Sequence, residues 1–163
     1  MSGLTAIVIG ATGATGTELV KQLMDDSRYA SVVVFSRRPL LVTGASLTTH
    51  IVDFDNPQAW SHLVKGDVLF SALATTLKQA GSQKEQYKID YTYQYQTAAI
   101  AAANGVAKYV LVSAMGANAK SWLFYPRIKG ELDNAARALP FKQIHIFRPG
   151  FLLRQPDKIR PME

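Results

Sequence analysis

Short apolar runs rich in β-branched residues recur along the chain and alternate with segments of helical periodicity. Several of these runs are apolar without alternation, which is typical of strands that helices cover on both faces. We expect strands at residues 5–9, 31–35, 48–52, 68–71, 109–113 and 143–147, and helices at 17–27, 57–64, 85–103 and 126–139. Alternating strands and helices predict an α/β fold built on a doubly wound parallel sheet with helices on both faces.

The first apolar run leads into a turn, Gly10-Ala-Thr-Gly-Ala-Thr-Gly16, in which three glycines are spaced by three residues. At a strand-to-helix turn, Gly10 permits the tight bend, Gly13 lets backbone N–H groups approach a pyrophosphate, and Gly16 lets the helix pack closely on the strand. The N–H groups and macrodipole of the helix N-terminus favour phosphate. A flexible loop is the alternative, but the strand before it and the helix after it favour a nucleotide-binding turn. The other residues of the turn expected at the ligand are Thr12, Ala14 and Thr15.

The composition describes an ordinary globular protein and excludes several kinds of site. The chain has 163 residues, 48% of them hydrophobic and 18% charged, which predicts a single domain over residues 1–163 with one core. Because there is no cysteine, disulfides, thiolate zinc sites and a cysteine nucleophile are excluded, and no metal is expected. No apolar stretch is long enough to span a membrane, and the first residues lead straight into a strand without a basic leader. A cytoplasmic location away from membranes is therefore expected.

The formal net charge of +6 raises the question of a nucleic-acid partner. The basic residues are scattered, apart from the pair Arg37-Arg38 and a tail that contains Arg154, Lys158 and Arg160. A solvated basic surface that attracts phosphorylated ligands is the favoured interpretation, and no nucleic-acid partner is expected.

The end of the second strand indicates which dinucleotide the turn would bind. In doubly wound folds an acidic residue at this place holds the adenosine ribose hydroxyls and selects NAD. Here the strand leads into Ser36-Arg37-Arg38 without a carboxylate, and arginine is suited to charge-assisted hydrogen bonds with a 2′-phosphate. The sequence therefore favours NADP(H) over NAD(H). An exposed loop pair is the alternative for the two arginines.

Two further strand ends are expected to contribute to the same ligand. Asp53-Phe54-Asp55 follows the third strand, where Asp53 is placed to accept from an adenine amino group. Asp55 or Asn56 is expected to cap the helix that begins at Pro57. The fourth strand is followed by residues that would let a cofactor lie against the backbone, namely Ala72, Leu73, Ala74 and Thr75.

Tyr125-Pro-Arg-Ile-Lys129 places a phenol and an ammonium four residues apart, which is one face of a helix. A nearby cation lowers the pKa of a tyrosine and makes it suitable as a proton donor to a carbonyl oxygen. Ser113 ends the fifth strand at the edge where ligands bind in open α/β folds, and its hydroxyl is suited to orient that carbonyl. Chance is the alternative for the Tyr–Lys pair, and local backbone bonding for Ser113.

Tyr87, Tyr91 and Tyr95 recur at helical spacing in the long helix expected at 85–103. An aromatic ligand face is one interpretation. Packing in the core or at a subunit interface is the favoured one.

Taken in order, the glycine turn, Ser113, Tyr125-x-x-x-Lys129 and Arg148-Pro149-Gly150 resemble the short-chain dehydrogenase/reductase superfamily. More narrowly, the chain is similar to its atypical members, related to the human HIV Tat-interacting oxidoreductase and the fungal NmrA-like regulators. The resemblance extends over residues 4–153 and implies an NAD(P)-binding Rossmann fold.

The resemblance also implies roles for residues. Ser113 would polarise the carbonyl, Tyr125 would be the acid or base, and Lys129 would bind the nicotinamide ribose and depress the Tyr125 pKa. Pro149 and Gly150 would lie near the nicotinamide. The catalytic asparagine of the superfamily aligns with about Asp90, so the proton relay is expected to be altered or absent.

Two features depart from the superfamily pattern. Pro126 follows the tyrosine, so the helix is expected to begin near Tyr125, which would then act almost as its N-cap. The sequence also ends 13 residues after Gly150, so the region that closes over the substrate is expected to be truncated.

Two functions remain open. The first is an NADPH-dependent oxidoreductase that transfers hydride to or from a small carbonyl or alcohol substrate. The second is a non-catalytic NADP(H)-binding redox sensor that acts through a protein partner. The intact Tyr125 and Lys129 favour the enzyme, while the missing substrate region favours the sensor. Either would be a monomer or a homodimer.

Overall fold

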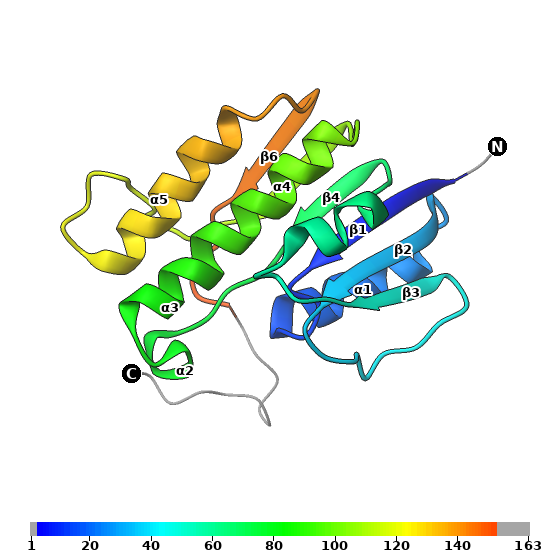
Figure 1. Ribbon diagram of the computed structural model, residues 1–163, viewed down its shortest axis with the longest axis horizontal. Helices are drawn as coiled ribbons and strands as arrows, with labels where there is room; N and C mark the ends of the chain where they lie inside the picture. Colours follow the sequence, from blue (N-terminus) through cyan, green and yellow to red (C-terminus); the bar gives the residue numbers. More distant parts are fainter. Residues whose placement is uncertain (1–2, 153–163) are drawn as a thin grey trace.

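The computed structural model describes residues 3–152 and confirms the doubly wound sheet (Figure 1). All neighbouring strands are parallel and lie in the order β3-β2-β1-β4-β5-β6, so the strand order reverses between β1 and β4. At such a reversal the connecting segments diverge and leave a crevice at the carboxyl ends of the strands. The strands are β1 (Leu4–Ile9), β2 (Tyr29–Ser36), β3 (Leu47–Ile51), β4 (Val68–Ser71), β5 (Lys108–Val112) and β6 (Gln143–Phe147). The basic tail at 154–160 lies outside the described residues.

The helices follow the expected order but differ in three places. The helix expected at 57–64 is two 3-10 turns, which turn the chain so that Trp60 enters the core and donates from Nε1 to the Asp53 carbonyl at 2.8 Å. The helix expected at 85–103 is interrupted by a π-helical segment, and a short helix precedes it. The elements are α1 (Ala14–Asp25), η1 (Pro57–Ala59), η2 (Ser61–Leu63), α2 (Leu77–Ala80), α3 (Gln83–Tyr87), η3 (Lys88–Thr92), α4 (Tyr93–Ala103) and α5 (Phe124–Arg137).

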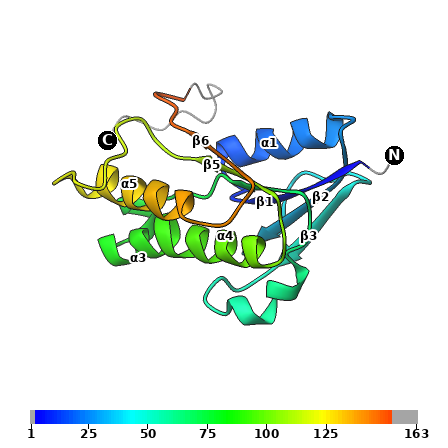
Figure 2. The same ribbon diagram turned by 90° about the horizontal axis from the view of Figure 1, so that it is seen from above.

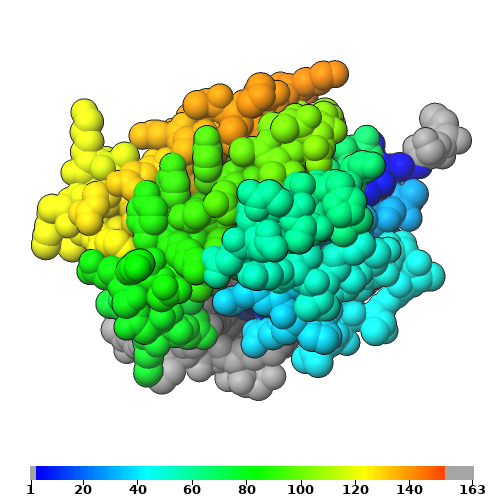
Figure 3. Space-filling model, in the orientation of Figure 1, coloured from blue at the N-terminus to red at the C-terminus, as the bar shows by residue number. Residues whose placement is uncertain are grey.

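Each face of the sheet has its own core, because alternate residues of a strand point to opposite faces. Helix α1 covers one face, and α3, α4 and α5 cover the other (Figure 2). Ala6 and Val8 of β1 pack in the cluster beneath α1, whereas Ile7 and Ile9 pack in the larger cluster on the other side. On that second side, α3, α4, α5 and the 57–63 segment lie on the face seen in Figure 3.

Asp55 ties the segment after β3 to the helical layer. Its carboxylate pairs with the Lys88 ammonium at 2.7 Å and accepts from the Tyr93 hydroxyl at 2.9 Å. Phe54 stacks on Tyr93 with 5.3 Å between ring centroids. Of the two expected caps, Asn56 is the N-cap of η1, although its side chain makes no capping hydrogen bond, and Asp55 is engaged elsewhere.

The tyrosines at helical spacing form a stacked series on α3, η3 and α4. Ring centroids are 5.0 Å apart for Tyr87 and Tyr91, and 5.9 Å apart for Tyr91 and Tyr95. Tyr91 and Tyr95 are half-buried and pack against the larger core cluster. Packing thus accounts for their spacing without a ligand.

Candidate functional site

The glycine turn has the geometry that its spacing predicts. Gly10 has a φ of +83°, and a Cβ there would overlap the Ala72 backbone, so only glycine fits. A Cβ on Gly16 would overlap the Gly10 carbonyl oxygen, which confirms the close packing of helix on turn. Gly13 is the N-cap of α1 and offers no capping side chain. The first N–H groups of α1 therefore depend on solvent or a ligand for partners.

A cavity of about 620 Å³ opens beside this turn, at the carboxyl ends of β1, β2 and β4. Most residues expected to bind the cofactor line it, namely Gly10, Thr12, Gly13, Ser36, Arg37, Arg38, Phe54, Ala72, Leu73, Ala74 and Thr75. Sequence reasoning missed the other lining residues, which are Phe35, Gln79, Ala80, Glu85 and Ile89. We call this cavity the cofactor groove.

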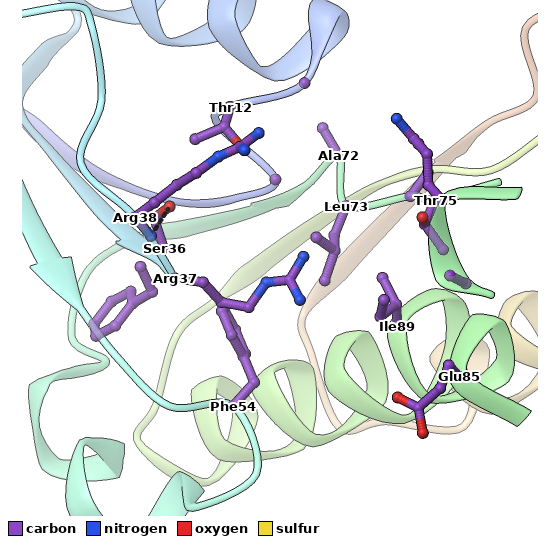
Figure 4. A pocket seen from close by; sticks show the side chains of 16 residues that line it. Thr12, Ser36, Arg37, Arg38, Phe54, Ala72, Leu73, Thr75, Glu85 and Ile89 are labelled. Carbon is purple, nitrogen blue, oxygen red and sulfur yellow. Dashed lines mark hydrogen bonds between the residues drawn. The ribbon is translucent and has the colours of Figure 1, made fainter.

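The two arginines after β2 extend in different directions. Arg38 passes close to Thr12 of the glycine turn, whereas Arg37 reaches over Phe54 toward Leu73 (Figure 4). The Arg38 backbone N–H donates to the Ser36 hydroxyl at 3.3 Å, which fixes the start of this loop. Arg38 also lines a second cavity of about 630 Å³ beside the glycine turn, together with Thr12 and Ala14.

Asp53 does not line the groove, although its neighbour Phe54 does. Its carboxylate accepts from the Asp55 backbone N–H at 2.9 Å, a local turn that holds the side chain against its own loop. Thr15 and Gly16 also stand back from the groove.

Tyr125 and Lys129 lie on the first turns of α5 in regular helical spacing. The helix begins at Phe124 with Leu123 as N-cap, so the expectation that Tyr125 acts almost as the cap is wrong. Pro126 fits the first turn because its missing N–H would have no partner there. The Lys129 ammonium lies 5.9 Å from the centroid of the Tyr125 ring. Lys129 is 1% exposed, whereas Tyr125 is 40% exposed.

The electrostatics of this pair differ from the expectation. Burial raises the pKa of Tyr125, and the Asp90 carboxylate raises it further, so the predicted lowering by Lys129 is wrong. Burial also lowers the pKa of Lys129 despite the opposing effect of Asp90, which lies 3.7 Å from the ammonium. Desolvation of the ammonium weakens the cationic influence that was expected to act on the phenol.

Ser113 directly follows β5 and is buried. Its backbone N–H donates to the Phe147 carbonyl at 2.7 Å, but its hydroxyl has no hydrogen-bond partner among the residues that the structure describes. Pro149 and Gly150 run beside the segment after β5, where the Pro149 carbonyl accepts from the Met115 N–H at 3.0 Å. None of the three residues proposed to carry the chemistry lines the cofactor groove; they are Ser113, Tyr125 and Lys129.

Two buried carboxylates surround Lys129. Asp90 comes from η3, and Asp133 lies one turn beyond Lys129 on α5, both with no exposed surface. Arg148 pairs with Asp133 through Nε at 2.9 Å and a terminal nitrogen at 2.7 Å. Sequence reasoning missed the roles of Asp133 and Arg148, although the four-residue spacing of Tyr125, Lys129 and Asp133 places all three on one helix face.

Known proteins resemble this chain over most of its length. The family described as NAD(P)H-binding matches residues 10–143. Protein FMP52, mitochondrial, of Debaryomyces hansenii is 36% identical over 160 residues, which cover 95% of this chain and 70% of that protein. Protein FMP52, mitochondrial, of Saccharomyces cerevisiae is 38% identical over 154 residues, which cover 92% and 66%. The chain therefore spans about two thirds of the length of these relatives.

Solved structures share the fold at low sequence identity. MoeE5 in complex with UDP-glucose and NAD has a TM-score of 0.73 and 20% identity, over 88% of this chain and 53% of MoeE5. A short-chain dehydrogenase/reductase superfamily protein from Agrobacterium tumefaciens with bound NAD has a TM-score of 0.70 and 17% identity, over 88% and 48%. The chain spans about half the length of these structures, and the likeness confirms the Rossmann fold.

The comparisons contradict the expected location. Curated relatives from several fungi are named as mitochondrial proteins, so the expectation of a cytoplasmic location is wrong. It rested on the absence of a membrane span and of a basic leader, and neither determines the compartment in which a folded domain works. Within residues 3–152, no helix has the length and apolarity needed to cross a membrane.

Proposed function

This chain belongs to the NAD(P)H-binding family, and on that premise we propose that it is an NADPH-dependent oxidoreductase of the atypical short-chain type. Its substrate would be a small carbonyl compound or the corresponding alcohol. The observation that carries the proposal is the pair Tyr125 and Lys129, held on one face of α5 with the ammonium 5.9 Å from the phenol ring centroid.

The glycine turn and the groove fit a dinucleotide. The N-terminus of α1, which lacks a capping side chain, suits a pyrophosphate, and the glycine positions leave room for one to approach the backbone. Solved relatives are described with NAD, so the preference for NADP(H) rests on this chain's own residues. Arg38 beside Thr12 supplies a cation for a 2′-phosphate, and no carboxylate at the end of β2 competes for it.

A bound nicotinamide would supply or accept the hydride. Because burial and Asp90 raise the pKa of Tyr125, its phenol is protonated at neutral pH and can donate a proton to a carbonyl oxygen. The buried Lys129 amino group lies 5.9 Å from the centroid of that phenol ring. The buried Ser113 hydroxyl has no partner among the described residues and is the second group that we propose would hydrogen-bond the same oxygen.

NADPH oxidation by the purified protein, followed by absorbance with a panel of aldehydes, ketones and quinones, tests the proposal. We expect turnover of at least one carbonyl class and its loss in Tyr125→Phe. Tyr91→Phe is the matched control, because it removes a phenol hydroxyl from the stacked series and should retain activity. Absence of turnover with every class, or full activity of Tyr125→Phe, would refute the catalytic assignment.

A non-catalytic NADP(H) sensor is the second candidate, favoured by two observations. The cofactor groove does not include Ser113, Tyr125 or Lys129. Beside Tyr125, Trp122 is 86% exposed and offers an apolar contact for a protein partner. Calorimetric titration together with the turnover assay decides between the two functions, because a sensor binds NADP⁺ and NADPH with different affinities yet turns over no carbonyl.

We also propose a mitochondrial location, supported by the names of the fungal relatives. Expression of the tagged protein, followed by fractionation against mitochondrial and cytosolic markers, tests it. Recovery of the protein in the cytosolic fraction alone would contradict this proposal.

A further inference from the structure

Asp90 occupies an unusual place in the helical layer. It lies at the centre of η3, where the helix widens into a π-turn between α3 and α4. Such turns are rare and occur often at functional sites. Ile89, its neighbour in the chain, lines the cofactor groove, while Asp90 itself has no exposed surface. The π-turn thus presents one residue to the groove and buries the next.

The Asp90 side chain connects two parts of the proposed site. Its Oδ1 lies 3.7 Å from the Lys129 ammonium on α5. The same oxygen accepts from the Thr75 backbone N–H at 3.4 Å, and Thr75 lines the cofactor groove. Gln86 donates to the Thr75 carbonyl at 3.4 Å, and Gln94 donates to the Asp90 carbonyl at 2.9 Å. Both amides are buried. The Gln86 bond holds the loop after β4 to the helical layer, and the Gln94 bond joins α4 to the π-turn within that layer.

Stability alone does not explain this pair. Burying a lysine and an aspartate costs desolvation that their attraction repays only in part, so apolar residues of similar volume often replace such pairs without loss. The second carboxylate near Lys129, Asp133, already has its own cation in Arg148. Among these four groups, Asp90 is therefore the carboxylate left to balance Lys129.

We propose that Asp90 is a positioning residue that fixes the Lys129 ammonium beside Tyr125 and links it, through Thr75, to the wall of the cofactor groove. This inference rests on the proposed function for its catalytic meaning, but the pairing itself is independent of turnover. The superfamily resemblance leads one to expect the relay asparagine at this position. Asp90 stands there instead, as a charged group that controls the lysine.

The titratable groups that face Lys129 come from three parts of the fold. They are Asp90 on η3, Tyr125 and Asp133 on α5, and Arg148 after β6, which is paired with Asp133. Asp90 is the nearest carboxylate not paired with an arginine, so its removal should act on Lys129 more than any other single change.

Nuclear magnetic resonance of the protein carrying ¹³C-labelled lysine measures this directly, with the Lys129 signal assigned by its loss in Lys129→Met. In Asp90→Asn, which retains an acceptor for Thr75, we expect the Lys129 pKa to fall by about 1 unit or more, because a neighbouring carboxylate favours the ammonium. Asp55→Asn is the matched control, since it removes the carboxylate paired with Lys88 of the same π-turn. A shift of the Lys129 pKa below about 0.3 unit in Asp90→Asn, or an equal shift in Asp55→Asn, overturns the proposal.

The pH profile of kcat separates positioning from a merely structural role. For an active wild-type protein, we expect Asp90→Asn to displace the profile while Asp55→Asn leaves it in place. A wild-type protein without turnover refutes the proposed function, and the lysine titration still decides the pairing. An unchanged profile in Asp90→Asn, alongside wild-type turnover, overturns the positioning role.

A urea-unfolding cycle tests the pair if Asp90→Asn is too unstable for spectroscopy. Because removing one partner leaves a buried charge, the double variant Asp90→Asn/Lys129→Met should unfold at a higher urea concentration than the less stable single variant. Additive losses across the cycle contradict the pairing.

Discussion

Arg38→Ala should convert a preference for NADPH into near indifference between NADPH and NADH. Arg38 runs beside Thr12 of the glycine turn and lines both cavities that meet there. A 2′-phosphate is the one group that NADPH has and NADH lacks on the adenosine side. An interaction of Arg38 with that phosphate therefore appears as a difference between the two affinities.

The magnitude follows from the exposure of the guanidinium. A hydrogen bond to a charged group contributes about 1.5–3 kcal/mol, and the exposed position of Arg38 places it at the lower end of that range. About 1.5 kcal/mol corresponds to a roughly tenfold rise in the Kd of NADPH. The Kd of NADH should change by less than about twofold, since its adenosine ribose carries no 2′-phosphate for this side chain to bind.

Arg37→Ala is the matched control, because it removes the adjacent arginine of the same loop. Its side chain reaches over Phe54 toward Leu73. We therefore expect it to face a part of the groove that both cofactors would occupy. Its loss should raise the Kd of NADPH and the Kd of NADH by similar factors, leaving the ratio of the two Kd values unchanged.

Calorimetric titration of each variant with both cofactors, at low and at high salt, measures these effects. Raising the salt should narrow the wild-type preference, because an exposed ion pair is screened within about 10 Å at 0.1 M. The role of Arg38 is refuted if wild-type protein binds NADH more tightly than NADPH, or if Arg38→Ala raises the Kd values of both cofactors equally.

Three further predictions concern stability, each measured by urea unfolding. Gly130→Ala should lower the free energy of unfolding by about 2–3 kcal/mol, because its Cβ would overlap the backbone of Asn118 and Ala119; an unchanged midpoint would contradict the close packing. Arg148→Met should lower the free energy of unfolding by about 2–3 kcal/mol, which is less than for a fully buried pair because Arg148 is 42% exposed. Adding Asp133→Asn should recover part of that free energy. Burial raises the pKa of Tyr109, so its stabilising contribution is complete below the ordinary value of about 10 and is lost as pH rises toward the folded-state value. Tyr109→Phe should therefore flatten the loss of stability above about pH 10, and an equally steep loss in the variant would exclude this tyrosine as a cause.

The strands and the glycine turn could be predicted because local chemistry determines them. A run such as residues 5–9 is apolar on both sides of the strand only where helices cover both faces of the sheet. Glycine is required at positions 10 and 16 because a side chain there would overlap neighbouring backbone, and the structure confirms both overlaps. The 3-10 turns at 57–63 could not be foreseen, because the burial of Trp60 against Phe35, a partner distant in sequence, determines the path of the chain there.

Part of the candidate site was predictable from the sequence, whereas its electrostatics were not. Spacing alone places Tyr125 and Lys129 on one helix face, and the structure keeps them there. The pKa of that tyrosine depends instead on burial and on Asp90, which a different helix delivers through a π-turn that periodicity does not reveal. A cation four residues away lowers a neighbour's proton affinity only to the extent that its own charge is stabilised. The motif thus predicts that Tyr125 and Lys129 lie together, while the Asp90 carboxylate beside the lysine influences the pKa of both groups.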